Sequence, residues 1–261
     1  QRTKLLLAPR GEFSQGALRI KSFKKKCFLL FSRLSRLHSK VHWHASTDTE
    51  LQDICRVYPE AAGHAYVAAD PVAMVSSSKP ASKSPKVSGV VRLVFISRIS
   101  PMKNLDFLLG VLASATSQVS LDIFGPIEDD MYWDQCSQLI ADLPGNVTVR
   151  VHGPMRQDLV SSTFAQYELF AFPTRGENFG HVIFESIRAG TPVLVSDQTP
   201  WRADEAGGIT VIPLHDTAGW KQEIERAAAR AADEHEVMRS AAWAYASKYA
   251  KDSSFNGDNL Q

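Results

Sequence analysis

The sequence predicts an α/β protein built on a Rossmann-like, doubly wound parallel sheet, preceded by part of a second Rossmann-like domain. Apolar runs rich in β-branched residues alternate with helical stretches from about residue 90 onward, as in a parallel sheet covered on both faces. A length of 261 residues with 44% hydrophobic residues is enough for a sizeable core. Residues 1–71 hold too few strand candidates to close a sheet of their own.

Six strand candidates define the predicted sheet. They are short apolar runs bounded by turn-forming residues, at 90–96, 119–124, 146–152, 168–173, 192–197 and 209–213. Helix candidates, which have apolar positions at helical spacing, lie at 104–117, 129–142, 156–166, 181–189 and 216–232. Because helices separate the strands, we expect the strands to run parallel.

The beginning of the chain predicts two strands on either side of a basic helix. "TKLLLAP" (3–9) and "KVHWHAS" (40–46) are the strand candidates, and the helix covers about 16–39. Thr47 with Glu50 three residues later predicts the start of a further helix. This piece needs more chain to bury its faces, so we expect that the amino-terminal half of a larger domain is absent.

A stretch rich in Ser, Lys and Pro divides the sequence. Residues 72–89 show no apolar period and predict a linker or mobile loop. The expected organisation is therefore an amino-terminal piece over residues 1–71, a linker over 72–89 and the main domain over 90–261.

Positive charge is concentrated near the beginning of the chain. Between Phe13 and Thr47 there are eight Lys or Arg residues and no Asp or Glu, whereas the whole chain has a net charge of +1. The basic helix over 16–40 stays open to three interpretations: a solvated face, a patch that meets anionic lipid at a membrane surface, and a nucleic-acid contact. We favour the first two and expect no nucleic-acid partner. The apolar members of this helix are expected to pack on an absent sheet; they are Phe23, Cys27, Leu30, Leu34 and Leu37.

Cysteine spacing and hydropathy indicate the compartment. Cys27, Cys55 and Cys136 are widely separated and form no CxxC motif, which argues against a disulfide framework and a zinc site and favours a reducing environment. The longest apolar runs are far shorter than the roughly 20 residues needed to span a bilayer. We expect a cytoplasmic protein, peripheral at the inner membrane face if the basic helix binds lipid.

Two cations follow the first strand of the predicted sheet. In an open parallel sheet, ligands gather outside the carboxyl ends of the strands, where helix amino termini offer N–H groups. Arg98 and Lys103 lie five residues apart across a proline-containing turn, and Asn104 starts the next helix. Two cations with helix-terminal amides suit a diphosphate. The alternative is a pair of solvated surface cations.

"RGENFGHVIFE" (175–185) follows the fourth strand and carries two glutamates. The helix that begins after Gly180 places His181, Glu185 and Arg188 on one face. The carboxylate of Glu185 suits a vicinal diol such as ribose, and a helix-stabilising pair with His181 is its alternative role. Glu177 lies a turn outside the helix, where it suits a sugar beyond a diphosphate or serves only as a charge near a helix amino terminus.

Several other chemistries lack their motifs. His181 and Glu185 are four residues apart, but we find no third metal ligand, and "HVIFE" is not HExxH. There is no GxGxxG after a strand, no GxxxxGK[ST] and no GxSxG. The sequence therefore does not support dinucleotide oxidoreduction, P-loop chemistry or serine hydrolysis.

Taken together, these residues resemble glycosyltransferase family 4, which contains retaining enzymes of the GT-B fold that use nucleotide-sugars. The resemblance rests on Glu177 and Glu185 as the family's E-x7-E, on the Arg98 and Lys103 pair, and on the run "FAFPTRGENFGHVIFESIRAGTPVLVSD". It is strong over residues 89–215. "APRGEFSQGALRIKSFKK" and "HASTDTE" also look like the end of the family's amino-terminal domain, whereas "HAYVAADP" departs from the usual "PNG"-like turn.

The resemblance implies a role for each site residue. Arg98 and Lys103 would bind the donor diphosphate and act in catalysis with Glu177, which would hold the transferred sugar together with the amides of Asn178, Phe179 and Gly180. Glu185 would bind the ribose, with His181 beside it. Gly153 and its neighbours would border the base, Gly125 would line the same edge, and Arg10 and Gly11 would lie on the acceptor side.

The predicted function is therefore that of a retaining, metal-independent glycosyltransferase of polysaccharide or glycolipid assembly. It needs a nucleotide-diphosphate sugar as donor substrate, no cofactor, and a saccharide or lipid-linked acceptor. The alternative is a truncated nucleotide-sugar-binding module without turnover. A nucleotide-sugar epimerase of similar architecture is a further alternative, but the acid and base residues that it needs are not found.

Overall fold

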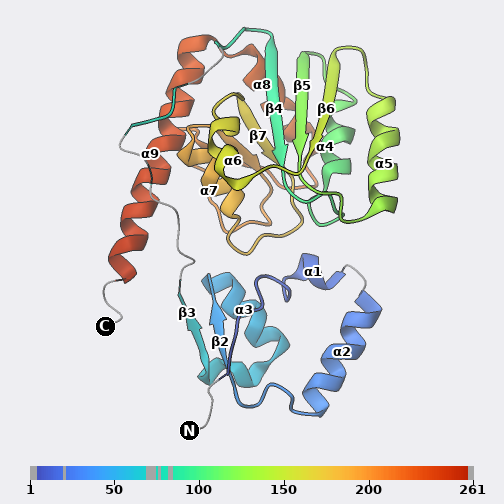
Figure 1. Cartoon of the computed structure of the whole chain (residues 1–261), viewed down its shortest axis with the longest axis vertical. Coiled ribbons are helices and arrows are strands. Elements are labelled where there is room, and N and C mark those ends of the chain that lie inside the picture. Colours follow the sequence, from blue (N-terminus) through green and yellow to red (C-terminus); the bar gives the residue numbers. More distant parts are fainter. Residues whose placement is uncertain (1–4, 20–21, 69–74, 76–77, 82–84, 258–261) are drawn as a thin grey trace. The chain divides into compact units, whose positions relative to one another are not determined.

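The computed structural model describes residues 5–19, 22–68, 75, 78–81 and 85–257, and it divides into two compact units (Figure 1). Unit 1 consists of residues 1–71, 175–179 and 198–200. Unit 2 consists of residues 72–174, 180–197 and 201–261. Each unit is built around its own parallel sheet, and each is described by itself.

Unit 2 contains a six-stranded parallel sheet with the order β6-β5-β4-β7-β8-β9. The first strand lies at the centre and the chain moves outward first to one side and then to the other, which is the doubly wound arrangement. The predicted fold class is confirmed, and all six strand candidates form strands. They are β4 (Val90–Ile96), β5 (Gln118–Phe124), β6 (Val147–Gly153), β7 (Leu169–Phe172), β8 (Val193–Val195) and β9 (Ile209–Val211).

The central strands are buried on both faces, as their sequences predict. Every residue of β7 is buried, and so is every residue of β8. Strands covered on both faces need near-continuous apolar runs because neither face meets water. At the edge, β6 alternates polar and apolar residues and is mostly exposed.

The predicted helices of unit 2 form; one starts at His181 as predicted, and every other helix end lies one to five residues inside the predicted bounds. The largest difference is at residues 113–117, which leave the helix because the Glu225 carboxylate accepts hydrogen bonds from the amides of Thr116 and Ser117. The helices are α4 (Leu105–Leu112), α5 (Asp130–Ala141), α6 (Gln157–Phe164), α7 (His181–Arg188) and α8 (Thr217–Ala229).

A long helix that the sequence did not predict ends unit 2. Helix α9 (Ala232–Gly257), red in Figure 1, packs along α7. Its buried positions fall at helical spacing, but they carry small or polar side chains instead of large apolar ones: His235, Arg239, Ala242 and Ala246. Arg239 is fully buried and donates to the carbonyl oxygen of Pro80. A pattern search based on hydrophobicity cannot find such a helix.

Unit 1 holds a three-stranded parallel sheet with the order β1-β2-β3. Strand β3 was not predicted, since its segment was noted only as a departure from the "PNG"-like turn. Helix α3 starts at Thr47 as predicted, and the Thr47 side chain accepts from the amide of Glu50. The elements are β1 (Leu5–Leu7), α1 (Gln15–Arg19), α2 (Ser22–Leu34), β2 (Val41–Ala45), α3 (Asp48–Val57), the 3-10 helix η1 (Pro59–Gly63) and β3 (Ala65–Val67).

The basic segment differs from the expected helix in two ways. Helix α2 ends at Leu34, and Arg36 takes a left-handed conformation with φ of 50°, so the helix does not reach residue 39. The apolar members that were expected to pack on a sheet are instead exposed, namely Phe23, Cys27, Leu30, Leu34 and Leu37. The face of α2 that packs on the rest of unit 1 carries Leu29 and Ser32. Leu29 packs against the core of the unit, and the Ser32 hydroxyl forms a hydrogen bond with the buried hydroxyl of Tyr58.

Candidate functional site

The loops that follow β4 and β7 lie at the topological switch point of unit 2. These two strands are neighbours at the centre of the sheet, and the chain leaves them toward opposite sides. A crevice outside the carboxyl ends of two such strands is where open α/β sheets bind ligands. The loop after β4 carries Arg98 and Lys103, so the structure places both predicted cations at this edge.

Both cations have partners within unit 2. Lys103 is only 9% exposed, and its Nζ lies 5.5 Å from the centroid of the Phe172 ring, at the last residue of β7. Arg98 is exposed and pairs with the carboxylate of Glu128. Lys103 therefore has a fixed position at the switch point, while Arg98 is held by a surface ion pair, which an anion in the crevice can replace at little cost.

Asn104 is a site residue whose role the sequence did not reveal. It is 2% exposed, it has φ of 61°, and its side-chain amide donates 2.9 Å to the carbonyl oxygen of Pro173. Thr174 donates in the opposite direction to the carbonyl oxygen of Met102. These two bonds tie the loop after β4 to the end of β7. The available signal was the residue type, because Asn tolerates the left-handed region better than most residues do.

Gly125 and Gly153, at the ends of two neighbouring strands, differ in why glycine suits each position. A Cβ at Gly125 would lie 1.8 Å from the carbonyl oxygen of Ser97, so glycine is required there by packing. The Gly125 amide donates to the carbonyl oxygen of Gly153. A Cβ at Gly153 would meet nothing within 4 Å, although φ is 73°. Gly153 thus borders open space, whereas Gly125 supports the loop.

Gly180 sets the start of helix α7. It is left-handed with φ of 79°, and its carbonyl oxygen accepts from the amides of Ile183 and Phe184. Those two bonds begin the helix and direct its amino terminus toward the carboxyl edge of the sheet. His181, the first residue of α7, is exposed beside this end.

Glu185 is partly buried on α7, and its side chain accepts a hydrogen bond from another helix. Gln157, the first residue of α6, donates its side-chain amide to Glu185 Oε1. Burial raises the pKa of Glu185 above its ordinary value, and the hydrogen bond from Gln157 and the charges of Arg188 and His181 partly oppose this shift. Its hydrogen-bond partner is therefore Gln157, a residue that the sequence analysis did not select. His181 acts on it only through its charge.

Residues 175–179 belong to unit 1. The amide of Glu177 donates 3.0 Å to the carbonyl oxygen of Gln198, which holds two loop segments of the unit together. The side-chain amide of Asn178 donates 2.9 Å to Ser46 Oγ, and Phe179 is buried. Asn178 and Phe179 are thus anchored by their side chains.

Arg10 and Gly11 follow β1 in a loop with an uncommon backbone. Both are left-handed, with φ of 54° and 82°. The buried carboxylate of Glu50 accepts from the amides of Gly11 and Ser46, at 2.8 and 2.7 Å, and Arg10 donates 3.1 Å to Ser46 Oγ. Glu50 therefore joins the loops after β1 and β2. The sequence identified Glu50 only as part of a helix cap, whereas its carboxylate is used across the sheet edge.

Two broader properties hold for the described residues. Among them, no group of three or more His, Cys, Asp and Glu side chains is arranged to hold a metal ion. In the same part of the chain, the helices are too short or too polar to cross a membrane.

Comparison with known proteins gives a family match. The family model described as "Glycosyl transferases group 1" matches residues 78–207, which include Arg98, Lys103, Glu177 and Glu185. A D-inositol 3-phosphate glycosyltransferase of Saccharomonospora viridis is 27% identical over 203 residues, which are 71% of this chain and 47% of that protein. The chain thus spans about half the length of this curated relative.

Solved structures share the architecture of this chain. Anabaena HepE in complex with UDP and glucose matches with a TM-score of 0.71 at 17% identity, over 99% of this chain and 72% of that one. A mutant of S. aureus TarM, in complex with fondaparinux, alpha-GlcNAc-glycerol and UDP, matches with a TM-score of 0.63 at 14% identity, over 82% of this chain and 43% of that one. At these identities the likeness shows the fold.

The family model covers the segment that carries the loops at the switch point, and the parallel sheets match those of GT-B glycosyltransferases. The sequence resemblance is therefore confirmed. Residues 78–207 form a domain of the glycosyl transferases group 1 family, glycosyltransferase family 4, and the chain has the GT-B fold.

Proposed function

We propose that this chain binds a nucleotide-diphosphate sugar and transfers the sugar, with retention of anomeric configuration, to a saccharide or lipid-linked acceptor in polysaccharide or glycolipid assembly. The observation that carries the proposal is Lys103, a buried ammonium group held over Phe172 at the switch point of the sheet. A cation held in a fixed position at this edge supports a bound diphosphate, because cations together with helix-terminal amides stabilise its charge.

A UDP-sugar is the first donor to test. HepE was solved with UDP and with UDP-glucose, and TarM was solved with UDP. Within unit 2, Gly153 borders open space where a base would lie. The Glu185 carboxylate on α7, which accepts from Gln157 at Oε1, is assigned to the ribose hydroxyls. In this proposal Glu177 and the amides of Asn178, Phe179 and Gly180 bind the transferred sugar.

The proposed reaction needs neither a metal nor a protein base. The bond between the anomeric carbon and the diphosphate oxygen breaks, and the charge that develops on the leaving diphosphate is stabilised by Arg98 and Lys103. The acceptor hydroxyl attacks the same face of the anomeric carbon. Its proton passes to an oxygen of the leaving diphosphate, which balances the reaction and gives retention.

The test measures donor binding and sugar transfer separately. The chain, and a version extended at its amino terminus, are titrated by calorimetry with UDP-glucose, UDP-N-acetylglucosamine and GDP-mannose. Both are then incubated with the labelled donors and bacterial membrane extract. Binding of one donor with transfer of label into a saccharide or lipid fraction, unchanged by EDTA, is the expected result. An absence of binding for all donors would overturn the proposal.

A nucleotide-sugar-binding module without turnover is the second candidate. It is favoured by the coverage of the curated relative, since this chain matches only 47% of that protein. The same experiment separates the two functions: binding without transfer, by the extended protein as well, would establish the module and exclude the enzyme.

Helix α2 supports a peripheral membrane contact for the same protein. Phe23, Phe31 and Leu34 are 79%, 64% and 76% exposed, and Lys24 and Lys26 are exposed on the same helix. Apolar side chains beside several cations suit a surface of anionic lipid, to which each cation adds about 1 kcal/mol of attraction. We therefore propose that α2 brings the protein to the membrane that holds a lipid-linked acceptor.

Vesicle flotation tests this contact. We expect binding to vesicles that contain phosphatidylglycerol and little binding to pure phosphatidylcholine. Replacing Lys24 and Lys26 together by Gln should release the protein, and Lys221→Gln on α8 is the matched control. Equal binding to both kinds of vesicle would exclude an electrostatic contact.

A further inference from the structure

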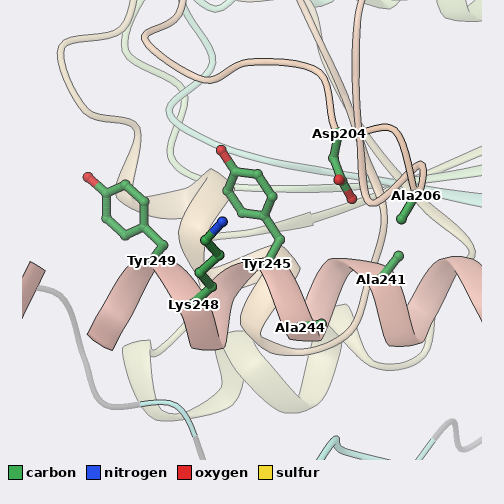
Figure 2. Close-up of a pocket in the computed structure, with 7 residues that line it drawn as sticks. All are labelled: Asp204, Ala206, Ala241, Ala244, Tyr245, Lys248 and Tyr249. Atoms are coloured by element: carbon green, nitrogen blue, oxygen red, sulfur yellow. The ribbon is translucent and has the colours of Figure 1, made fainter. Parts of the chain in front are cut away.

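A pocket of about 380 Å³ lies between α9 and the loop that joins β8 to β9 in unit 2 (Figure 2). Its walls come from Tyr245, Lys248 and Tyr249 on the helix and from Asp204 on the loop, and alanines make up the rest of the lining. The volume falls within the range of small-molecule sites. No step of the proposed transfer uses these residues.

Polar groups lie on one side of α9 at this pocket. In Figure 2 the two tyrosine hydroxyls and the Lys248 amine point the same way from the helix, and the Asp204 carboxylate lies beside Tyr245. Burial raises the pKa of Tyr245, and the charge of Asp204 adds to the shift. The Tyr245 hydroxyl therefore keeps its proton, and it can donate as well as accept a hydrogen bond.

The aromatic walls are held rigidly from behind. The Trp201 ring, which is 3% exposed, lies with its centroid 6.2 Å from that of Tyr245 and 5.2 Å from that of Tyr249. Phe184 of α7 packs against both Trp201 and Tyr249. The tyrosine rings are only partly buried, so they present apolar faces in a fixed orientation. Fixed walls lower the entropic cost of binding.

This combination selects one class of ligand. A sugar ring has apolar C–H faces that suit aromatic walls, and its hydroxyls pair with hydroxyl, ammonium and carboxylate groups. The pocket carries one carboxylate, Asp204, and one ammonium group, Lys248, so its lining favours neither anions nor cations. We propose that the α9 pocket is a binding site for a neutral saccharide. The proposal rests on the proposed function in one respect only, which is that this saccharide is a part of the acceptor distant from the sugar that reacts.

Ligand-observed NMR of the whole chain tests the site without any donor. Saturation transfer is measured to maltotriose and chitotriose as neutral trisaccharides, and to trigalacturonic acid as an anionic one. We expect transfer to at least one neutral trisaccharide. Tyr245→Phe and Tyr249→Phe keep the rings against Trp201, and each should weaken binding about fivefold through a lost hydrogen bond.

A variant that fills the pocket provides the matched comparison. Ala244 lines the pocket and is exposed, so Ala244→Arg blocks the space without disturbing a buried contact. Val237→Arg adds the same side chain to α9 outside the pocket, at a residue that is 65% exposed. Loss of the saccharide signal in Ala244→Arg alone is the expected result.

Three outcomes would overturn the site: no signal from either neutral trisaccharide, binding of the anionic one alone, or a signal that survives Ala244→Arg. Donor titration in the same samples separates this proposal from the transfer reaction. Donor binding and transfer without saccharide binding would remove the pocket proposal and leave the function. Saccharide binding without donor binding would remove the function and leave the site.

Discussion

The side-chain amide of Asn104 donates a 2.9 Å hydrogen bond to the carbonyl oxygen of Pro173, and this bond joins the loop after β4 to the end of β7 at the switch point of the sheet. Asn104 is buried and left-handed. Its neighbour Lys103 lies over Phe172, the residue before Pro173. The Asn104 bond thus helps to hold the loop that carries Lys103, the proposed diphosphate cation.

Replacing Asn104 separates its backbone role from its hydrogen bond. Asn104→Gly keeps the left-handed backbone and loses the bond, so we expect it to lower the free energy of unfolding by about 1–2 kcal/mol. Asn104→Ala adds the strain of a left-handed Cβ, about 1 kcal/mol more. Urea unfolding of both variants measures the difference. Equal stabilities would show that the backbone conformation costs nothing at this position.

Lys103→Met should reduce sugar transfer more than donor binding. The methionine fills the space of the lysine stem but removes the charge that stabilises the leaving diphosphate. By analogy with the loss of one preformed donor in an active site, kcat should fall by about 10²-fold or more while the donor Kd changes less. Lys221→Met on α8 is the control. An equal effect on kcat and on Kd would contradict the role in leaving-group stabilisation.

Glu185→Ala should weaken donor binding. Two hydrogen bonds from ribose hydroxyls to a carboxylate are lost, which we expect to raise the donor Kd by about 10- to 100-fold. Glu205→Ala, which removes an exposed carboxylate from the loop between β8 and β9, is the matched control. Calorimetric titration with UDP-glucose measures both. An unchanged Kd in Glu185→Ala would exclude the ribose assignment.

Donor binding should also depend on pH through Glu185. Its pKa is raised above 4.5 in the folded protein, so affinity for UDP-glucose should fall as the pH drops through a midpoint above 4.5. Gln157→Ala removes a hydrogen bond that lowers this pKa, and the midpoint should move to higher pH. The effect on folding has the opposite sign: the stability contribution of this group is complete below 4.5 and is lost as the pH rises through the folded pKa.

The titration uses the sugar nucleotide because its diphosphate does not ionise near neutral pH, whereas the terminal phosphate of UDP does. The protein therefore supplies any midpoint that is observed. A profile that is the same in Glu185→Gln and in the unaltered chain would show that another group causes the pH dependence.

Two glycines should respond to alanine in opposite directions. Gly125→Ala places a Cβ 1.8 Å from the carbonyl oxygen of Ser97, so the backbone must move and we expect a loss of stability. Gly110 lies inside α4 with nothing within 4 Å of its Cβ position. Gly110→Ala should therefore raise the free energy of unfolding by about 0.5–1 kcal/mol. Thermal unfolding followed by circular dichroism compares the two. A stable Gly125→Ala variant would refute the packing requirement.

The local pattern of apolar residues was enough to predict the sheet of unit 2, but it did not predict helix α9. The six strands are short apolar runs of the length of a strand. Such runs are typical of parallel strands that are buried on both faces. Helix α9 was not predicted because its buried positions hold His235, Arg239 and alanines instead of large apolar residues. The burial of Arg239 depends on a partner distant in sequence, the carbonyl oxygen of Pro80. The spacing of hydrophobic residues does not predict such a partner.

The sequence by itself determined the family, the parallel sheet and the two cations that follow β4, because motif spacing and strand hydrophobicity are local properties of the chain. Only the tertiary structure decided that Gln157 donates a hydrogen bond to Glu185 and that Glu50 joins the loops after β1 and β2. It also decided that the carbonyl group of Ser97 leaves no room for a Cβ at Gly125. The contacts of Gln157 with Glu185, of Gly11 with Glu50 and of Gly125 with Ser97 join residues 28 or more positions apart. Which distant groups meet depends on how the strands are ordered and how their loops close, and no single segment of the sequence carries that information.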